Sequence, residues 1–292
     1  VVLTNQALFY GRPHALFEKL TCDAVVDGTW KYDDFVGGRD AQDRKLHFNQ
    51  NLTLNGGWRV GGSLLVESFG YDETLYRTYA IATPAADGTT RYTPYVGTPR
   101  LPNLDYVLSA NTPTRGGLNG ELLAVWGKDE NFFEWSSADI VFLNASAIWR
   151  PTGQLRVEGR YQLQSYQRRS DGSYVGIRRI PRLRVEYQVT RPIFFRLIAE
   201  QDGNFQDALR DDSRTNRPIF IRGANGSYLP ALRTSTRRLR VDWLFSYQPT
   251  PGTVFFAGYG SSHRLDDDDR RGRAYRRAQD GFFAKLSYLF RL

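Results

Sequence analysis

The 292-residue sequence is poor in the side chains that usually build disulfides, metal centres and active sites. One cysteine, Cys22, excludes an internal disulfide framework and any zinc site made of several cysteines. The three histidines form no closely spaced pair, and no serine has the G-x-S-x-G context of a hydrolase. We therefore expect no cofactor, no metal and no catalysis. A hydrolase that assembles His47 or His263 with a serine and an acid across strands is the enzymatic alternative.

Long hydrophobic runs are also missing, because no window approaches 18 consecutive apolar residues. This excludes a transmembrane helix. The mean hydropathy is −0.49, yet aromatic residues make up 14% of the chain. This combination is typical of strands whose two faces meet different solvents, since alternation halves the apolar content of each strand.

The charge is unbalanced but dispersed. The net charge of +8 would suit a nucleic-acid partner. The basic residues, however, recur at every second position along predicted strands, and the sequence has no zinc finger, basic helix or RNA-binding signature. Nucleic acid is therefore not an expected partner.

Alternation of apolar and polar residues is the strongest positive signal. From Leu155 to Arg168, an apolar set that includes Val157 and Tyr161 alternates with a charged set that includes Arg156 and Glu158. Such runs cover roughly 10–14 residues, longer than the usual strand of about 5–6 and suited to a tilted membrane span of about 9–11. The runs expected to form twelve strands are 16–30, 46–54, 58–68, 104–112, 118–128, 139–149, 155–168, 182–190, 193–200, 238–247, 253–264 and 282–292.

Short and long connections alternate between these runs. Turns rich in Gly and Pro, such as Asn55 to Gly57 and Arg191-Pro192, alternate with polar segments such as Tyr71 to Asn103 and Gly203 to Thr234. This predicts an all-β fold, an antiparallel transmembrane β-barrel of at least 12 strands with short periplasmic turns, long extracellular loops and both termini on the turn side. Residues 1–292 would form a single barrel domain, and a soluble β-sandwich is the alternative.

The C-terminal strand carries an alternating aromatic pattern. It resembles the signal by which outer-membrane assembly machinery recognises its clients, although Leu292 stands where a terminal Phe is commoner. The resemblance implies an outer-membrane location and the barrel-assembly machinery as a partner during insertion. The residues of this expected assembly signal are Phe282, Leu286, Tyr288, Phe290 and Leu292.

Four further segments carry a family resemblance: Trp149-Arg150-Pro151, Glu186 to Arg191, Arg210-Asp211-Asp212, and Lys285 to Arg291. The sequence resembles, best over its second half, a family of bacterial outer-membrane proteins of unknown function. Its members place a domain like carbohydrate-binding module family nine ahead of a C-terminal barrel. The resemblance implies the C-terminal part of a longer protein, with upstream strands raising the count to fourteen or more. No sugar-binding residue carries over to this sequence.

On the barrel interpretation, the apolar face meets lipid and the charged face lines the lumen. The residues expected to face lipid and lipopolysaccharide include Leu155, Tyr161, Leu183, Tyr187, Leu197, Trp243, Phe245 and Leu286. The residues expected to line the lumen are Arg156, Glu158, Arg160, Arg182, Arg184, Glu186, Arg196, Glu200, Arg238, Arg240 and Asp242.

Two alternative functions follow from this charged face. An excess of guanidinium groups favours a passive channel, or a recognition site, for small polar solutes that are anionic or saccharide. Alternatively, Arg and Glu pair across a narrow lumen and close it, and the barrel anchors a periplasmic domain or binds a partner through its loops. The run Asp266 to Arg277 could bind a divalent cation or contact lipopolysaccharide phosphates, or it could be a solvated loop.

Overall fold

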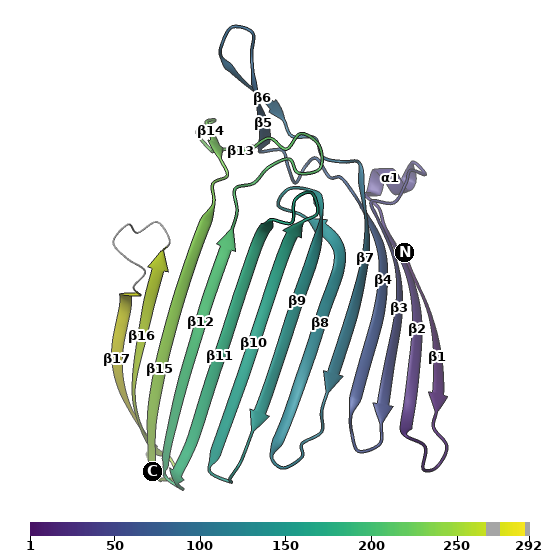
Figure 1. The fold of residues 1–292 in the computed structure, drawn as a ribbon. Coiled ribbons are helices and arrows are strands. Elements are labelled where there is room, and N and C mark those ends of the chain that lie inside the picture. Colours follow the sequence, from purple (N-terminus) through teal and green to yellow (C-terminus); the bar gives the residue numbers. More distant parts are fainter. Residues whose placement is uncertain (267–274, 290–292) are drawn as a thin grey trace.

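The computed structural model describes residues 1–266 and 275–289. A single antiparallel sheet of 13 strands runs through it (Figure 1). The sheet strands, in spatial order, are β1 (Val2–Tyr10), β2 (Phe17–Thr29), β3 (Asp43–Leu54), β4 (Arg59–Gly70), β7 (Arg100–Asn111), β8 (Leu118–Asn131), β9 (Ser136–Trp149), β10 (Leu155–Arg168), β11 (Tyr174–Thr190), β12 (Ile193–Gln206), β15 (Thr234–Thr250), β16 (Thr253–Asp266) and β17 (Arg276–Tyr288). The prediction of an all-β, antiparallel fold with at least 12 sheet strands is confirmed.

The strand that sequence reasoning missed is β1. It pairs with β2 from Val2 opposite Asp27 to Tyr10 opposite Lys19. Neither of its faces is consistently polar, so the segment lacks the period-two signal that marked the other strands. Because 13 is odd, β1 and β17 run in the same direction, so β1 begins at the long-loop rim and β17 ends at the turn rim (Figure 1). The prediction that both termini lie at the turn side is therefore wrong for the N-terminus.

Short turns gather at one rim and longer connections at the other (Figure 1). In the turn between β3 and β4, Gly56 and Gly57 have φ of 84° and 87°, a conformation that side chains with a Cβ rarely adopt. The predicted alternation of connection lengths is present only in part. Two connections at the long-loop rim are short, residues 132–135 between β8 and β9 and residues 169–173 between β10 and β11.

The two longest connections carry a second sheet, although the sequence predicted only polar loops there. Its strands, in the order β14-β13-β5-β6, are β14 (Tyr228–Pro230), β13 (Ile219–Arg222), β5 (Tyr79–Pro84) and β6 (Thr90–Pro94). These strands are too short for a periodicity signal, and pairing between β5 and β13 joins segments far apart in the chain. We call residues 71–99, 132–135 and 207–233 the loop cap.

The loop cap has its own hydrophobic core at the long-loop rim. Trp135 is 2% exposed, and its indole Nε1 donates to the Thr98 carbonyl at 2.7 Å. A Cβ on Gly97 would lie 2.3 Å from the Trp135 ring, so this backbone position must be glycine for the ring to fit. The buried residues of this core are Tyr76, Ile81, Tyr95, Leu101, Trp135, Val175, Leu209 and Ile219.

The sheet is curved but its two outer strands, β1 and β17, are not joined in the part of the chain that the structure describes. Closure into a barrel therefore stays a prediction. The one helix among the described residues, α1 (Tyr32–Val36), has five residues, and none there is long and apolar enough to cross a membrane.

Candidate functional site: the arginine-rich inner face

The registers between strands sort the side chains into two faces, because residues opposite one another on paired strands point to the same side. Leu155 lies opposite Tyr187, which lies opposite Phe195, which in turn lies opposite Phe245. Leu197 lies opposite Trp243. All eight residues expected to face lipid share this outer face, and five of them, Leu183, Tyr187, Leu197, Trp243 and Leu286, are exposed.

The other, inner face carries the eleven residues expected to line a lumen. One row across the strands consists of Arg160, Arg182, Glu200 and Arg240. The next rows toward the turn rim are Glu158, Arg184, Ile198 and Asp242, then Arg156, Glu186 and Arg196. Arg238 lies opposite Asp202. The structure thus brings all eleven together on one side of β10, β11, β12 and β15, which we call the arginine wall.

Ion pairs link most of the arginine wall. Arg156 Nη2 lies 2.8 Å from Glu158 Oε2, and its Nη1 lies 2.9 Å from Glu186 Oε2. Further pairs join Arg160 to Glu158 at 3.5 Å, Arg182 to Glu200 at 3.3 Å, Arg240 to Asp242 at 2.7 Å, and Arg184 to Glu186. Every carboxylate of the set therefore has an arginine partner.

An excess of positive charge remains after this pairing. The set holds seven arginines and four carboxylates, a difference of +3. Within the described residues, Arg196 and Arg238 make no ion pair, although both line a hollow of about 890 Å³ on the inner face. Arg240 also lines it, with its side chain 68% exposed. This geometry can attract an anion, since the guanidinium groups face open space and donate in a planar fork.

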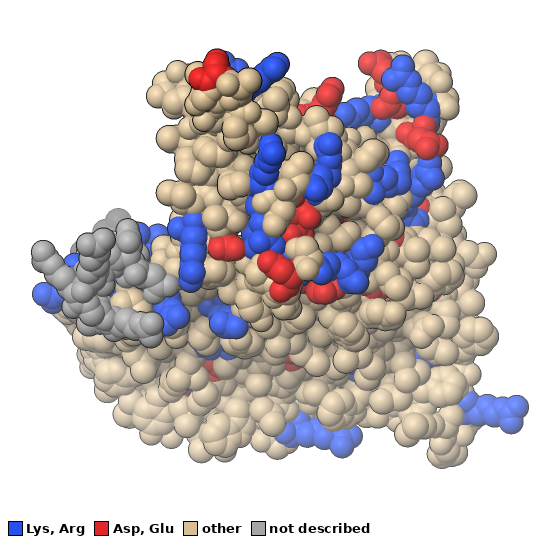
Figure 2. All heavy atoms as spheres, turned by 45° about the horizontal axis from the view of Figure 1, so that its top comes forward, with Lys and Arg blue, Asp and Glu red and all other residues tan. Residues whose placement is uncertain are grey.

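The space-filling view agrees with this segregation of charge. Figure 2 shows Lys, Arg, Asp and Glu gathered around the rim that carries the loop cap, whereas the outer wall below it is almost free of charge. A few basic groups reappear at the opposite edge. An uncharged belt between two charged rims is the surface expected of a chain with lipid around its middle.

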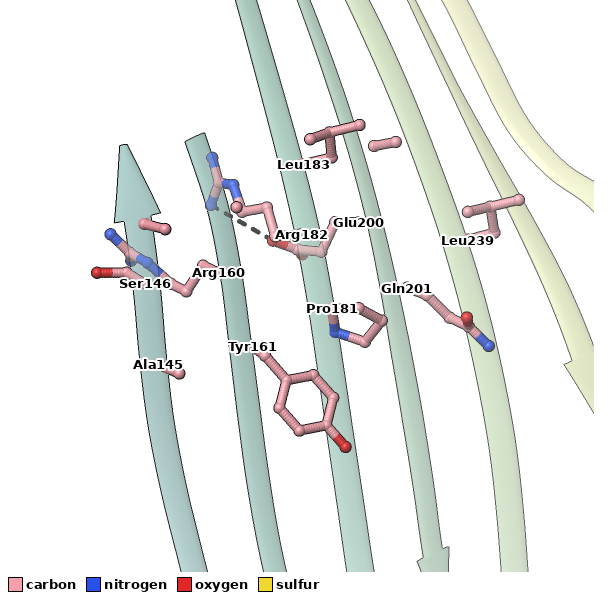
Figure 3. Close-up of a pocket in the computed structure, with 13 residues that line it drawn as sticks. Ala145, Ser146, Arg160, Tyr161, Pro181, Arg182, Leu183, Glu200, Gln201 and Leu239 are labelled. Atoms are coloured by element: carbon pink, nitrogen blue, oxygen red, sulfur yellow. Dashed lines mark hydrogen bonds and ion pairs between the residues drawn. The ribbon is translucent and has the colours of Figure 1, made fainter. Parts of the chain in front are cut away.

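The outer face has a shallow groove of about 580 Å³ behind the arginine wall (Figure 3). Tyr161, Pro181 and Leu239 line it from three different strands. The groove exists because several neighbouring outer positions are small, namely Ala145, Ala147, Gly159 and Ala199. On the opposite side of the same strands, Arg182 is paired with Glu200.

The expected assembly signal is described in part. Phe282, Leu286 and Tyr288 lie on the outer face of the edge strand β17, opposite Tyr259, Phe255 and Thr253. Their side chains are exposed. Phe290 and Leu292 lie outside the described residues, as does most of the run from Asp266 to Arg277.

Sequence reasoning missed a buried charge network that anchors the loop cap. Arg168 is fully buried and donates from Nε and Nη2 to the Glu134 carboxylate, at 2.9 and 2.6 Å. It also donates to Asp207 at 2.7 Å and to the Ala208 carbonyl at 3.0 Å. Burial raises the pKa of Glu134, and the hydrogen bonds from Arg168 and from the Arg210 backbone N–H oppose that rise. No local pattern marked Arg168 apart from the other arginines.

It also missed an acidic cluster on the inner face of the other half of the sheet. Glu67 on β4, Asp105 on β7 and Asp129 on β8 bring carboxylate oxygens within 4.8 Å of one another. Asn103 and Glu130 lie beside them. The three acids are 38 and 24 residues apart in sequence, so only the strand order reveals the cluster.

Comparison with known proteins adds little. No protein-family model and no curated protein matches this sequence. Among solved structures, the chain is similar to the apoprotein form of the FrpB iron transporter from Neisseria meningitidis, F5-1 variant, with 13% identity and a TM-score of 0.47. The match covers 98% of this chain, which spans about half the length of that protein (49%). The family resemblance drawn from the sequence therefore stays a prediction.

Proposed function

We propose that this chain forms the wall of an outer-membrane β-barrel whose arginine wall guides or recognises small polar solutes, anionic or saccharide. The observation that carries the proposal is the separation of the two faces. The same strands that present Arg182, Arg184 and Arg240 on one side present uncovered Leu183, Tyr187 and Trp243 on the other. A water-filled lumen inside and lipid outside would satisfy both faces at once.

The expected partners follow from the same surfaces. Lipid acyl chains would pack on the outer face, and lipopolysaccharide would contact the charged rim at the loop cap. The assembly machinery would bind the C-terminal strand, which is an edge strand with Phe282 and Leu286 on its outer face. Closure of the barrel would need pairing at the β1 and β17 edges, either with each other or with further strands.

A second candidate is a closed barrel that anchors another domain or binds a partner through its loops. The observation that favours it is the ion pairing of the arginine wall, in which all four carboxylates neutralise arginines. The packed loop cap at one rim would add to the blockage. The unpaired Arg196 and Arg238 favour the channel, since among the described residues neither has an acidic partner.

Single-channel conductance distinguishes the channel from the closed barrel. The purified, detergent-extracted protein is inserted in a planar bilayer, and anion and cation permeabilities are compared from reversal potentials. The channel predicts stable conductance that favours anions, and a loss or reversal of that preference in the double variant Arg182→Glu, Arg184→Glu.

The matched control is Arg150→Glu, Arg191→Glu, which changes the net charge equally but lies in the short turns. It should keep the anion preference. A silent bilayer from a correctly inserted protein would overturn the channel and support the closed anchor.

A further inference from the structure

The acidic cluster differs from the arginine wall in having almost no positive partners. His47 Nε2 lies 2.5 Å from Glu67 Oε1, and it is the one basic group paired with the cluster in the described part of the chain. Lys45 lies opposite Glu67, but its ammonium group sits over the Phe69 ring at 5.1 Å. Arg100 donates to the carbonyls of Ala41, Gln42 and Ser68 instead.

Two side chains of the cluster are buried and incompletely satisfied. Asp105 is 2% exposed, and its Oδ1 has no hydrogen-bond partner among the described residues. Asn103 is 4% exposed, and its Nδ2 donates to Asp129 at 2.7 Å and also to Glu130, which places this amide beside the cluster. The Asn103 carbonyl oxygen likewise has no partner in the described chain. Buried oxygens without donors are costly, so their presence points to a missing positive ligand.

The backbone next to Asp105 is shaped to leave room for its carboxylate. Gly127 lies opposite Asp105 on the adjacent strand and has a φ of 150°. A Cβ on Gly127 would lie 2.6 Å from Asp105 Oδ1 and 2.3 Å from the Leu104 carbonyl oxygen. Any larger residue would therefore push into the carboxylate, and glycine leaves the space beside this oxygen free.

From this geometry we infer that Glu67, Asp105 and Asp129, with the Asn103 carbonyl, bind a calcium ion on the inner face below the loop cap. All the donor atoms are oxygens, which is the chemistry that hard divalent cations select. Oxygens on opposite sides of a calcium ion lie about 4.6–5.2 Å apart, which accommodates oxygens that all lie within 4.8 Å of one another. Magnesium demands a near-ideal octahedron at about 2.0–2.1 Å and gives up its waters reluctantly, so a site built from protein oxygens of several strands suits calcium better.

The ion would bridge three strands, because Glu67 comes from β4, Asp105 from β7 and Asp129 from β8. The chain leaves the sheet between β4 and β7 to build the first part of the loop cap. Calcium would therefore cross-link β4, β7 and β8 where the loop cap begins, and it would neutralise the acidic half of the inner face. This role is independent of whether the lumen conducts.

The test uses the full chain in detergent, freed of metal with EDTA and titrated with CaCl2 by calorimetry. We expect saturable binding of one ion per chain, a melting temperature at least about 3 °C higher with saturating calcium, and weaker binding of MgCl2. Asp105→Asn should weaken calcium binding at least about tenfold. Asp202→Asn is the matched control on the inner face of β12 and should bind calcium as the wild type does.

Melting in EDTA separates a misfolded variant from one that folds but no longer binds calcium. In EDTA, Asp105→Asn should melt no lower than the wild type, because it removes an unpartnered buried carboxylate. If that variant fails to fold, Asn103→Ala gives a second reading of the same affinity. The absence of saturable calcium binding by the wild type, or equal affinity in Asp105→Asn, would overturn the site.

Discussion

The two halves of the inner face carry charge in different ways. On the arginine wall, the four carboxylates are held by arginines from the same or adjacent strands, and several arginine side chains remain exposed. In the acidic cluster, Asp105 and Asn103 are buried below the loop cap and have oxygens without partners. An open wall can leave its excess charge to water, whereas a covered cluster needs a ligand that neutralises it.

The largest expected effect comes from releasing the loop cap. Arg168→Leu would leave the buried Glu134 carboxylate without its main partner, at a cost of about 3–5 kcal/mol in the free energy of unfolding. Urea unfolding in detergent measures it, and limited proteolysis should show faster cleavage of residues 207–218.

The control is Arg169→Leu, whose pair with Asp139 is exposed on both sides. It should cost less than about 1 kcal/mol. Equal losses in the two variants would mean that the Arg168 network does not hold the loop cap.

The next effect tests the backbone at the acidic cluster. Gly127→Ala should cost about 1–3 kcal/mol, because its Cβ would collide with the Leu104 carbonyl at a φ of 150°. At Gly159, a Cβ would meet nothing within 4 Å, so Gly159→Ala should change the free energy of unfolding by less than about 0.5 kcal/mol. Urea unfolding measures both, and similar values would contradict the tight approach at Gly127.

Two isosteric changes, one on the arginine wall and one in the acidic cluster, should differ in their effect on stability. Glu186→Gln removes the charge that holds Arg156 and Arg184, and should destabilise the fold by about 1–2 kcal/mol. Asp105→Asn, measured in EDTA, should not destabilise it, because no arginine or lysine pairs with Asp105 in the described structure. Thermal unfolding compares the two, and a loss at Asp105 as large as at Glu186 would refute the contrast.

The smallest effect concerns Asp72, a half-buried acid at the start of the loop cap. Lys31 Nζ, 2.8 Å away, and the Thr74 hydroxyl lower the pKa of Asp72 to about 2. Because the folded-state pKa lies below the ordinary value of 3.8, this contribution is complete above about pH 4 and is lost as the pH falls toward 2.

Both side chains of the pair are partly exposed to solvent, so the effect should be below about 1 kcal/mol. Unfolding of the wild type and Asp72→Asn from pH 5 to pH 2 measures it. Curves that run parallel over this range would show that the pair adds nothing.

The sheet and its two faces could be predicted because the alternation of apolar and polar residues is visible within each single strand. Along β10, apolar and charged residues alternate from Leu155 to Gln164, and this pattern fixes which side chains share a face. Strand β1 was not predicted because its two faces are similar in polarity. The small sheet of the loop cap was missed because its strands are too short to show a periodicity, and its two hairpins are joined by contacts between residues about 140 apart, such as Ile81 and Ile219.

The candidate sites divide in the same way. The arginine wall follows from alternation within neighbouring strands, so the sequence was sufficient to group Arg156, Arg182 and Arg240. The acidic cluster depends on the register of β4 against β7 and of β7 against β8, which places Glu67 opposite Asn103 and Asp105 opposite Gly127. The sequence predicted that these strands follow one another, but the 29-residue connection between β4 and β7 leaves their register open. The burial of Arg168 depends on the loop cap, and no local sequence pattern predicts how the loop cap folds.

The central claim is that the outer face meets lipid and the inner face meets water. We would replace Cys22 with Ser, introduce single cysteines along β10 at Tyr161, Gln162, Leu163 and Gln164, and reconstitute each variant in lipid vesicles. Labelling with a membrane-impermeant thiol reagent then measures exposure to water. The structure predicts fast labelling at positions 162 and 164 and protection at 161 and 163, whereas equal or reversed labelling would contradict the assignment of the two faces.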